Sequence, residues 1–320
     1  VIDAASRDLR ISVDGALRAA VGQQALGFDL KAALALKGDD ATLEQLSLVS
    51  TDGAGRLDAS GHARWQPALQ VDAQATCTAL DPGVLLPDWK GRLNGQLKAE
   101  TVEASATVDS VPEVRFSASI DRSTLRGYPL SLATRGVVAV AADQRRLVLD
   151  QFSLKSGSAS LDAQGAFWPA LDAQVRAQVP DLRALLPSLA GALQLQARAQ
   201  GALQSSRVQA QGQLRGLHSP ALALASATLS ADLDLARESR LQLDASGLAV
   251  GNRRVSGASF TLQGRPQAMT VKAEVTATQP RAALAVQLQG ALDLAQRRWQ
   301  GTLQQASLTP PAGQPWLLRQ

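Results

Sequence analysis

Strict alternation of apolar and polar residues constrains this chain more than any other feature. In 69–77 the odd positions are apolar or small, and Gln, Asp or Thr lies between them. The same pattern occurs in 173–179, 193–199 and 269–277, and the longest run has apolar or small residues at the even positions of 284–294. Since successive side chains of a strand point to opposite faces, each segment has one apolar and one polar face. Helical spacing is not sustained in these windows, so the sequence predicts an all-β fold.

Short turns connect the alternating runs. The segments 33–48, 137–152, 232–247 and 291–304 each show a strand, a short polar turn and a returning strand. Turns of this length join antiparallel neighbours, whereas parallel strands need a crossover of a dozen or more residues. We therefore predict an antiparallel meander rather than a parallel β-helix. At roughly 12 residues for a strand and its connection, the chain would hold about 26 strands.

Internal repetition organises the chain. The motif LEQLSL at 43–48 recurs as LDQFSL at 149–154, and LDASGHARWQPAL at 57–69 recurs as LDAQGAFWPAL at 161–171. A third, degenerate copy begins at 241. Ordered motifs about 100 residues apart are typical of a repeat architecture. We predict one elongated array over residues 1–320, with approximate repeats at 26–124, 125–217 and 218–320.

Two similar segments interrupt the alternation, LDPGVLLPDW at 80–89 and PDLRALLPSL at 180–189. Asp81 and Asp181 each adjoin a proline, which suits a helix N-terminus: Asp accepts hydrogen bonds from free N–H groups, and Pro is tolerated in the first turn. The third copy has only ATQPRAAL at 277–284 and is predicted to lack the interruption.

A second proline in each interruption, Pro87 or Pro187, is expected to end the helix, because the residue before a proline is pushed out of helical geometry. We predict one or two helical turns near 81–87 and near 181–187. Being short and apolar, each would rest on the apolar face of the sheet and cross it. The residues expected to make these crossings are Val84, Leu85, Leu86, Leu182, Leu185 and Leu186.

Composition restricts the class of partner. The chain has 32 Lys and Arg against 28 Asp and Glu, interspersed without long runs of one sign, so we expect no nucleic-acid partner. No run of 18 apolar residues occurs, and the first residues alternate instead of forming a signal peptide. We expect a piece of a longer protein, with any anchor or export signal outside it.

Catalytic and metal-binding patterns are weak. The single cysteine, Cys77, continues the apolar alternation, and His62 and His218 have no partners at metal-ligand spacing. Asp58 and Asp162 fall on the polar face, and the short loops provide no cleft for paired carboxylates. We therefore expect no metal, no cofactor and no enzymatic activity. Trp65, Trp168 and Trp299 lie near turns and are expected to anchor the sheet edge.

The segment GRLDASGHARWQPALQVDAQATCTALDPGVLLPDWKGRLNGQLKAE at 55–100 resembles the repeated body of the TamB family of translocation and assembly module subunits, within the AsmA-like superfamily. The segments 123–138 and 195–217 are similar to it, and the resemblance extends over the whole chain as a repetitive pattern. It implies a middle segment of a periplasmic protein that is anchored in the inner membrane of diderm bacteria. It also implies a β-taco-like trough, phospholipid transfer towards the outer membrane, and outer-membrane protein assembly with a TamA-like partner.

The alternating residues indicate the apolar face of the sheet as the candidate binding surface. Such a face either closes on itself or stays a groove occupied by an apolar ligand, and aromatics at 3% leave an aliphatic wall that suits phospholipid acyl chains. The alternatives are a structural stalk or adhesin-like spacer with a closed core, and a polysaccharide-acting enzyme, which would need clustered acidic and aromatic residues. The predicted groove lining is Leu46, Leu48, Leu57, Leu69, Val71, Leu161, Val175, Leu193, Leu195, Leu241, Leu243, Val271, Val275, Leu284, Val286 and Leu288.

Overall fold

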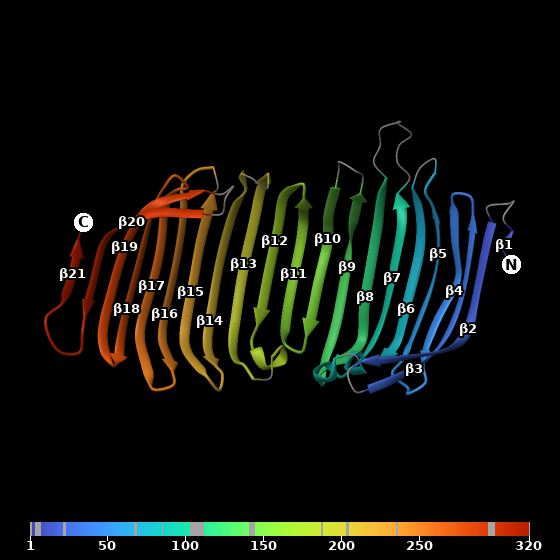
Figure 1. The fold of residues 1–320 in the computed structure, drawn as a ribbon, viewed down its shortest axis with the longest axis horizontal. Coiled ribbons are helices and arrows are strands. Elements are labelled where there is room, and N and C mark those ends of the chain that lie inside the picture. The colour runs from blue at the N-terminus through green and yellow to red at the C-terminus, as the bar shows by residue number, and fades with distance from the viewer. Residues whose placement is uncertain are drawn as a thin grey trace. The chain divides into compact units, whose positions relative to one another are not determined.

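The computed structural model describes residues 2–3, 8–21, 24–66, 69–84, 86–102, 112–140, 145–186, 188–202, 205–234, 236–293 and 298–319. These residues form an antiparallel β-structure with almost no helix, as predicted (Figure 1). The chain divides into two compact units, Val1–Gly157 with Gln164–Trp168, and Ser158–Ala163 with Pro169–Gln320.

The first unit is a meander in which each strand pairs antiparallel with the next along the chain. Its strands are β1 (Ile2–Asp3), β2 (Asp8–Val21), β3 (Gln24–Lys37), β4 (Asp40–Ser50), β5 (Arg56–Arg64), β6 (Gln70–Leu80), β7 (Gly91–Val102), β8 (Glu113–Leu125), β9 (Tyr128–Val140) and β10 (Arg145–Ser156). The next strand, β11 (Ala159–Trp168), has residues in both units.

The second unit repeats this plan from β12 onwards, again with antiparallel pairing of consecutive strands. Its strands are β12 (Ala170–Val179), β13 (Ala190–Ala202), β14 (Arg207–His218), β15 (Leu222–Asp234), β16 (Ser239–Val250), β17 (Arg253–Arg265), β18 (Ala268–Gln279), β19 (Arg281–Asp293), β20 (Arg298–Thr309) and β21 (Trp316–Arg319).

The strands are longer than the sequence analysis expected. The described residues form 21 strands instead of about 26, because the strands from β2 to β20 run for 9 to 14 residues before each turn. All four hairpins predicted from the sequence are present, at β3–β4, β9–β10, β15–β16 and β19–β20. The estimate of roughly 12 residues for a strand with its connection was therefore too short.

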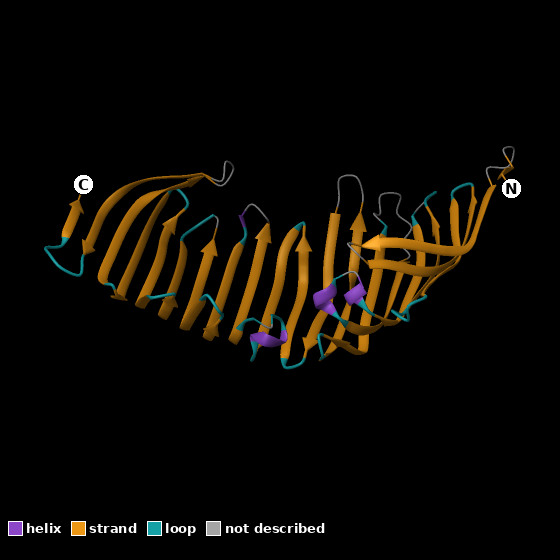
Figure 2. Cartoon of the chain, turned by 60° about the horizontal axis from the view of Figure 1, so that its bottom comes forward, coloured by secondary structure: helices purple, strands orange, loops and turns teal. Residues whose placement is uncertain are grey.

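The sequence repeat corresponds to repeated elements. LEQLSL lies in β4 and LDQFSL in β10, while LDASG lies in β5 and LDAQG in β11. Helical turns follow both β6 and β12, as η1 (Pro82–Val84), η2 (Pro87–Trp89) and η3 (Leu182–Ala184), drawn in purple in Figure 2. As predicted, the third copy lacks them, because Pro280 alone separates β18 from β19. The repeat boundaries at 124 and 217 stay a prediction.

The helical turns are 3-10 turns whose caps match the sequence prediction in part. The Asp181 carboxylate accepts a hydrogen bond from the backbone N–H of Arg183 at 3.0 Å, and that of Asp81 accepts from the N–H of Gly83 at 2.8 Å. Pro87 does not end the helical segment but is the first residue of η2, since its fixed φ suits that position. The prediction for Pro187 falls outside the described residues.

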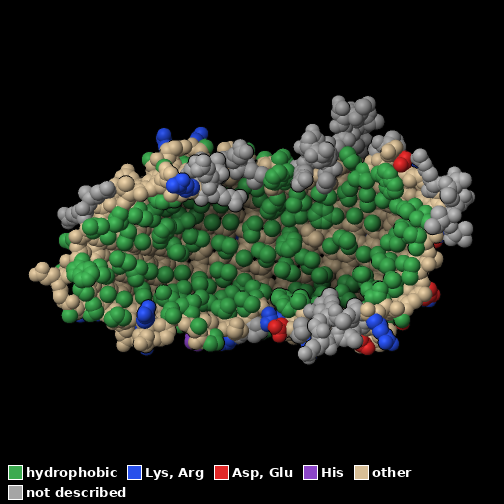
Figure 3. Space-filling view, in the orientation of Figure 1, with side chains coloured by type: hydrophobic (Ala, Val, Ile, Leu, Met, Phe, Trp, Pro, Cys, Tyr) green, Lys and Arg blue, Asp and Glu red, His purple; other side chains and the backbone are tan. Residues whose placement is uncertain are grey.

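The strands within each unit curve along their length (Figure 2), and their two faces differ in chemistry. On the face seen in Figure 3 the described side chains are almost all apolar, and this face of each unit is hollowed along its middle. Lys, Arg, Asp and Glu side chains appear only around its rim. The alternation in the sequence is thus preserved as a curved sheet with one apolar, concave face.

Aligned β-bulges bend the first unit near the end of β6. The strand pairings shift between Cys77 and Leu80 on β6 and between Ile120 and Ser123 on β8. Asn94 of β7 lies between them: its carbonyl oxygen Oδ1 accepts from the N–H of Ala79 at 2.9 Å, and its Nδ2 donates to the carbonyl of Arg122 at 3.0 Å. A bulge increases local twist and bending, so this one amide holds the bend from both sides.

Replacing Asn94 with alanine is expected to lower the free energy of unfolding of the first unit by about 1–3 kcal/mol, because two backbone groups lose their partners. Chemical denaturation followed by circular dichroism measures this loss. Gln96→Ala, on the exposed face of the same strand, is the control and should change stability by less than about 0.5 kcal/mol. Equal effects of the two substitutions would contradict the role given to Asn94.

Candidate functional site

Three rows of apolar side chains cross the strands of the second unit in register. Because directly paired residues share a face of the sheet, each row is continuous over nine strands or more. The first row is Val175, Ala197, Ala210, Ala231, Leu241, Leu262, Val271, Leu288 and Leu303. The second is Ala177, Leu195, Gly212, Leu229, Leu243, Phe260, Ala273, Val286, Ala306 and Leu318, and the third is Val179, Leu193, Leu214, Ala227, Ala245, Ala258, Val275, Leu284, Leu308 and Trp316.

The first unit has three corresponding rows, with one polar member. They are Gly15, Leu30, Leu48, Leu57, Cys77, Gly95, Ile120, Leu132 and Leu154; Val13, Ala32, Leu46, Ala59, Ala75, Leu97, Ala118, Thr134 and Phe152; and Ile11, Leu34, Leu43, Gly61, Ala73, Ala99, Phe116, Gly136 and Leu149. We call the two sets of rows the apolar face of each unit.

The apolar face of each unit is partly open to solvent. Leu97 is 46% exposed, Leu243 40% and Leu284 43%, although all three lie within the rows. Among the described residues no large side chain is fully buried, and the buried apolar residues are mostly alanines. A packed second layer would bury such leucines almost completely. Within its own unit, the apolar face therefore behaves as an open surface that retains capacity to bind an apolar ligand.

Most of the predicted lining residues lie on this face. Fourteen of the sixteen are paired within the rows or, for Val71, directly with Ala63 of β5. The other two are half-buried: Leu69 lies just before β6, and Leu161 lies in β11. Whether these side chains contact a lipid stays a prediction. The lining prediction did not include Phe116, Ile120 or Phe260, although the same alternation in β8 and β17 would have found them.

The helical turns lie at the ends of strands. Since β6 pairs directly with β7, and β12 with β13, each segment turns the chain back between neighbouring strands (Figure 1). Leu86 is 56% exposed and Leu186 49%, Leu185 is exposed, and Val84 and Leu182 are half-buried. Leu85 lies outside the described residues. The expected crossing of the apolar face by these side chains stays a prediction.

Two of the polar residues singled out in the sequence, Asp58 and His62, lie in ion pairs. Arg56 binds Asp58 at 2.6 Å and holds the pKa of that carboxyl below its usual range. Arg64 does the same for the pKa of Asp40, at 2.7 Å, and the His62 ring lies 3.3 Å from the same carboxylate. Within the described ranges no three His, Cys, Asp or Glu side chains are grouped as metal ligands would be. These pairs lie partly exposed at the surface, where ion pairs contribute little to stability.

Cys77 lies in an apolar row between Leu57 and Gly95, as the alternation predicted. Of the three predicted edge tryptophans, Trp65 and Trp168 lie at the ends of β5 and β11 and Trp299 at the start of β20, each at least 36% exposed. In the part of the chain that the structure describes, no helix has the length and hydropathy to cross a bilayer.

Comparison with protein families identifies the family of this chain. No solved structure matches the chain. Residues 14–320 match the family model described as the N-terminal domain of TamB, whereas the resemblance noted in the sequence implied a middle segment. The match covers nearly the whole chain and agrees with an antiparallel sheet that has one apolar face, and the chain therefore belongs to the TamB family.

Proposed function

We propose that the apolar face of each unit binds phospholipid acyl chains and that the chain helps phospholipid to pass between the inner and outer membranes. Family membership supports a TamB-like role in the translocation and assembly module. The proposal places the chain in the periplasm of a Gram-negative envelope. An inner-membrane anchor and contacts with a TamA-like protein would lie in regions outside this chain, and the proposal includes no enzymatic step.

The partly exposed rows of aliphatic side chains carry this proposal. Burial of an acyl chain against them would contribute roughly 0.8 kcal/mol per CH2 group removed from water. The rows consist mainly of Ala, Val and Leu, so neighbouring positions along a row offer an acyl chain nearly equal contacts. Equal contacts favour movement along the sheet rather than capture at one point. Support for an assembly role with a TamA-like partner comes from the family alone.

Site-specific photocrosslinking in the periplasm tests the proposal. A photoreactive residue at Val71 or Leu288, both on apolar faces, should give phospholipid adducts. The matched controls, Gln70 and Gln287, precede these residues on the same strands and point to the opposite face, so they should give few or none. Equal labelling of the two faces, or no adducts at all, would favour a structural stalk without lipid.

A further inference from the structure

The two turn edges of the second unit differ in charge. Consecutive antiparallel strands place the turns after β12, β14, β16 and β18 at one edge and the turns after β13, β15 and β17 at the other. The first of these edges carries five exposed arginines, which we call the basic edge: Arg183, Arg215, Arg253, Arg254 and Arg281. It is the lower edge of that unit in Figure 1.

The basic edge has few acidic residues. Of the carboxylates in the described second unit, Asp181 alone lies in one of its four turns, and it caps the backbone of η3. Asp244 and Glu274 lie six and five residues before the ends of their strands. None of the five arginines forms an ion pair with a described carboxylate. Their positive charge is therefore available to an external anion.

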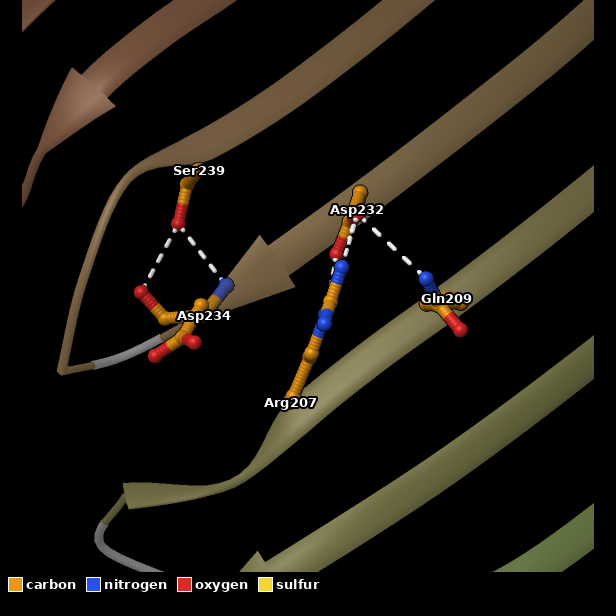
Figure 4. Close-up of polar contacts among 5 residues, drawn as sticks. All are labelled: Arg207, Gln209, Asp232, Asp234 and Ser239. Atoms are coloured by element: carbon orange, nitrogen blue, oxygen red, sulfur yellow. Dashed lines mark hydrogen bonds and ion pairs between the residues drawn. The ribbon is translucent and has the colours of Figure 1, made fainter.

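At the opposite edge two arginines, Arg207 and Arg240, form ion pairs with acids. Arg207 forms a two-pronged ion pair with Asp232, with Nε–Oδ1 at 2.7 Å and Nη2–Oδ2 at 2.5 Å, and Gln209 donates to the same carboxylate (Figure 4). Arg207 lowers the pKa of Asp232. In the next turn, Arg240 pairs with Glu238 at 3.3 Å. The charge difference between the edges thus follows from pairing as well as from composition.

The basic edge adjoins the apolar face directly. After the bulges at the strand ends, a further apolar row runs through Leu217, Leu224, Leu248, Val255, Ala277 and Ala282. Arg253 lies two residues beyond Val255 on β17, and it pairs with Val250. Arg254 and Arg281 lie on either side of β18, opposite Gln279 and Thr278. An open pocket at this point is lined by Asn252, Arg253 and Arg254 together with the end of β18.

We infer that the basic edge binds the phosphate of an amphiphilic lipid whose acyl chains lie on the adjoining apolar face. Guanidinium groups bind phosphate oxygens through paired, charge-assisted hydrogen bonds, and the aliphatic row beside them accepts the chains. The lipid therefore lies in one orientation, with its headgroup at the turns after even-numbered strands. This inference rests on the proposed function and adds to it the position and chemistry of the headgroup site.

The test is a titration of the full chain with three ligands: dihexanoyl phosphatidylglycerol, octyl glucoside and inorganic phosphate. Only the first combines acyl chains with a phosphate. The edge variant is the triple substitution Arg253→Gln, Arg254→Gln and Arg281→Gln. The control, Arg176→Gln, Arg198→Gln and Lys272→Gln, removes the same charge from exposed positions on the polar face. Isothermal titration calorimetry gives the affinities, and circular dichroism confirms that both variants fold.

The edge variant should bind the phospholipid at least about tenfold more weakly, because each cation near an anionic lipid contributes about a fivefold factor. Its affinity for octyl glucoside should not change, and the control should behave as the wild type. Equal losses in the two variants, or tight binding of inorganic phosphate alone, would overturn the headgroup site. Binding of both amphiphiles unchanged in the edge variant would overturn the inference alone. Failure of the wild type to bind either amphiphile would overturn the proposed function as well.

Discussion

Aspartate in place of Leu243 and Leu284 will remove most acyl-chain binding by the second unit while its sheet stays folded. The two leucines lie in different apolar rows and are 40% and 43% exposed, so a carboxylate there keeps much of its hydration when the face is empty. An acyl chain placed over it would strip away that water, which costs several kcal/mol for a charge without a partner. We expect lipid adducts from a photoreactive residue at 288 to fall at least about tenfold.

The control for this experiment is a carboxylate on the other face. Ser230 follows Leu229, the neighbour of Leu243 in its row, and it is exposed on the polar face between Gln211 and Gln242. Ser230→Asp should leave the adduct yield and the melting temperature unchanged. Lipid adducts that persist in the double aspartate variant would show that acyl chains do not lie on these rows. The proposed function would then lose its main support.

Valine in place of Gly136 is expected to destabilise the first unit by about 3 kcal/mol or more. Gly136 of β9 is buried, and an added Cβ would lie 2.2 Å from the carbonyl oxygen of Val148 and 3.1 Å from the ring of Phe116. The oxygen belongs to the backbone of β10, so its overlap with the added Cβ cannot be relieved without moving that strand. Thermal unfolding followed by far-ultraviolet circular dichroism should show a lower melting temperature for the first unit.

Gly15 of β2 provides the matched control, since it also occupies an apolar row of the first unit but has no heavy atom within 4 Å of an added Cβ. Gly15→Val should change stability by less than about 0.5 kcal/mol, because valine suits a strand. If Gly136→Val unfolds at the wild-type temperature, the close approach of β9 and β10 does not restrict residue 136.

Much of the architecture could be predicted because it depends on local signals. Alternation in segments such as 69–77 and 284–294 indicated strands and separated their faces, since side-chain direction has a period of two residues. The cap at Asp181 and the missing interruption at 277–284 were local as well. The predicted number of strands was wrong because turn positions in an Ala- and Gln-rich sequence are weakly marked, so the length of each strand could not be inferred.

The sequence by itself determined the all-β class and the antiparallel order. It also determined which alternate positions of strands such as β6 and β19 are apolar, because each of these follows from a few adjacent residues. Only the tertiary structure decided the register that joins Val175 to Leu303 in one row, the bend held by Asn94, and the placing of Phe116 against Gly136. Register and bulges accumulate over many strands and turns. The same accumulation set Arg207 beside Asp232 and left the basic edge without such partners, a difference that no local pattern specifies.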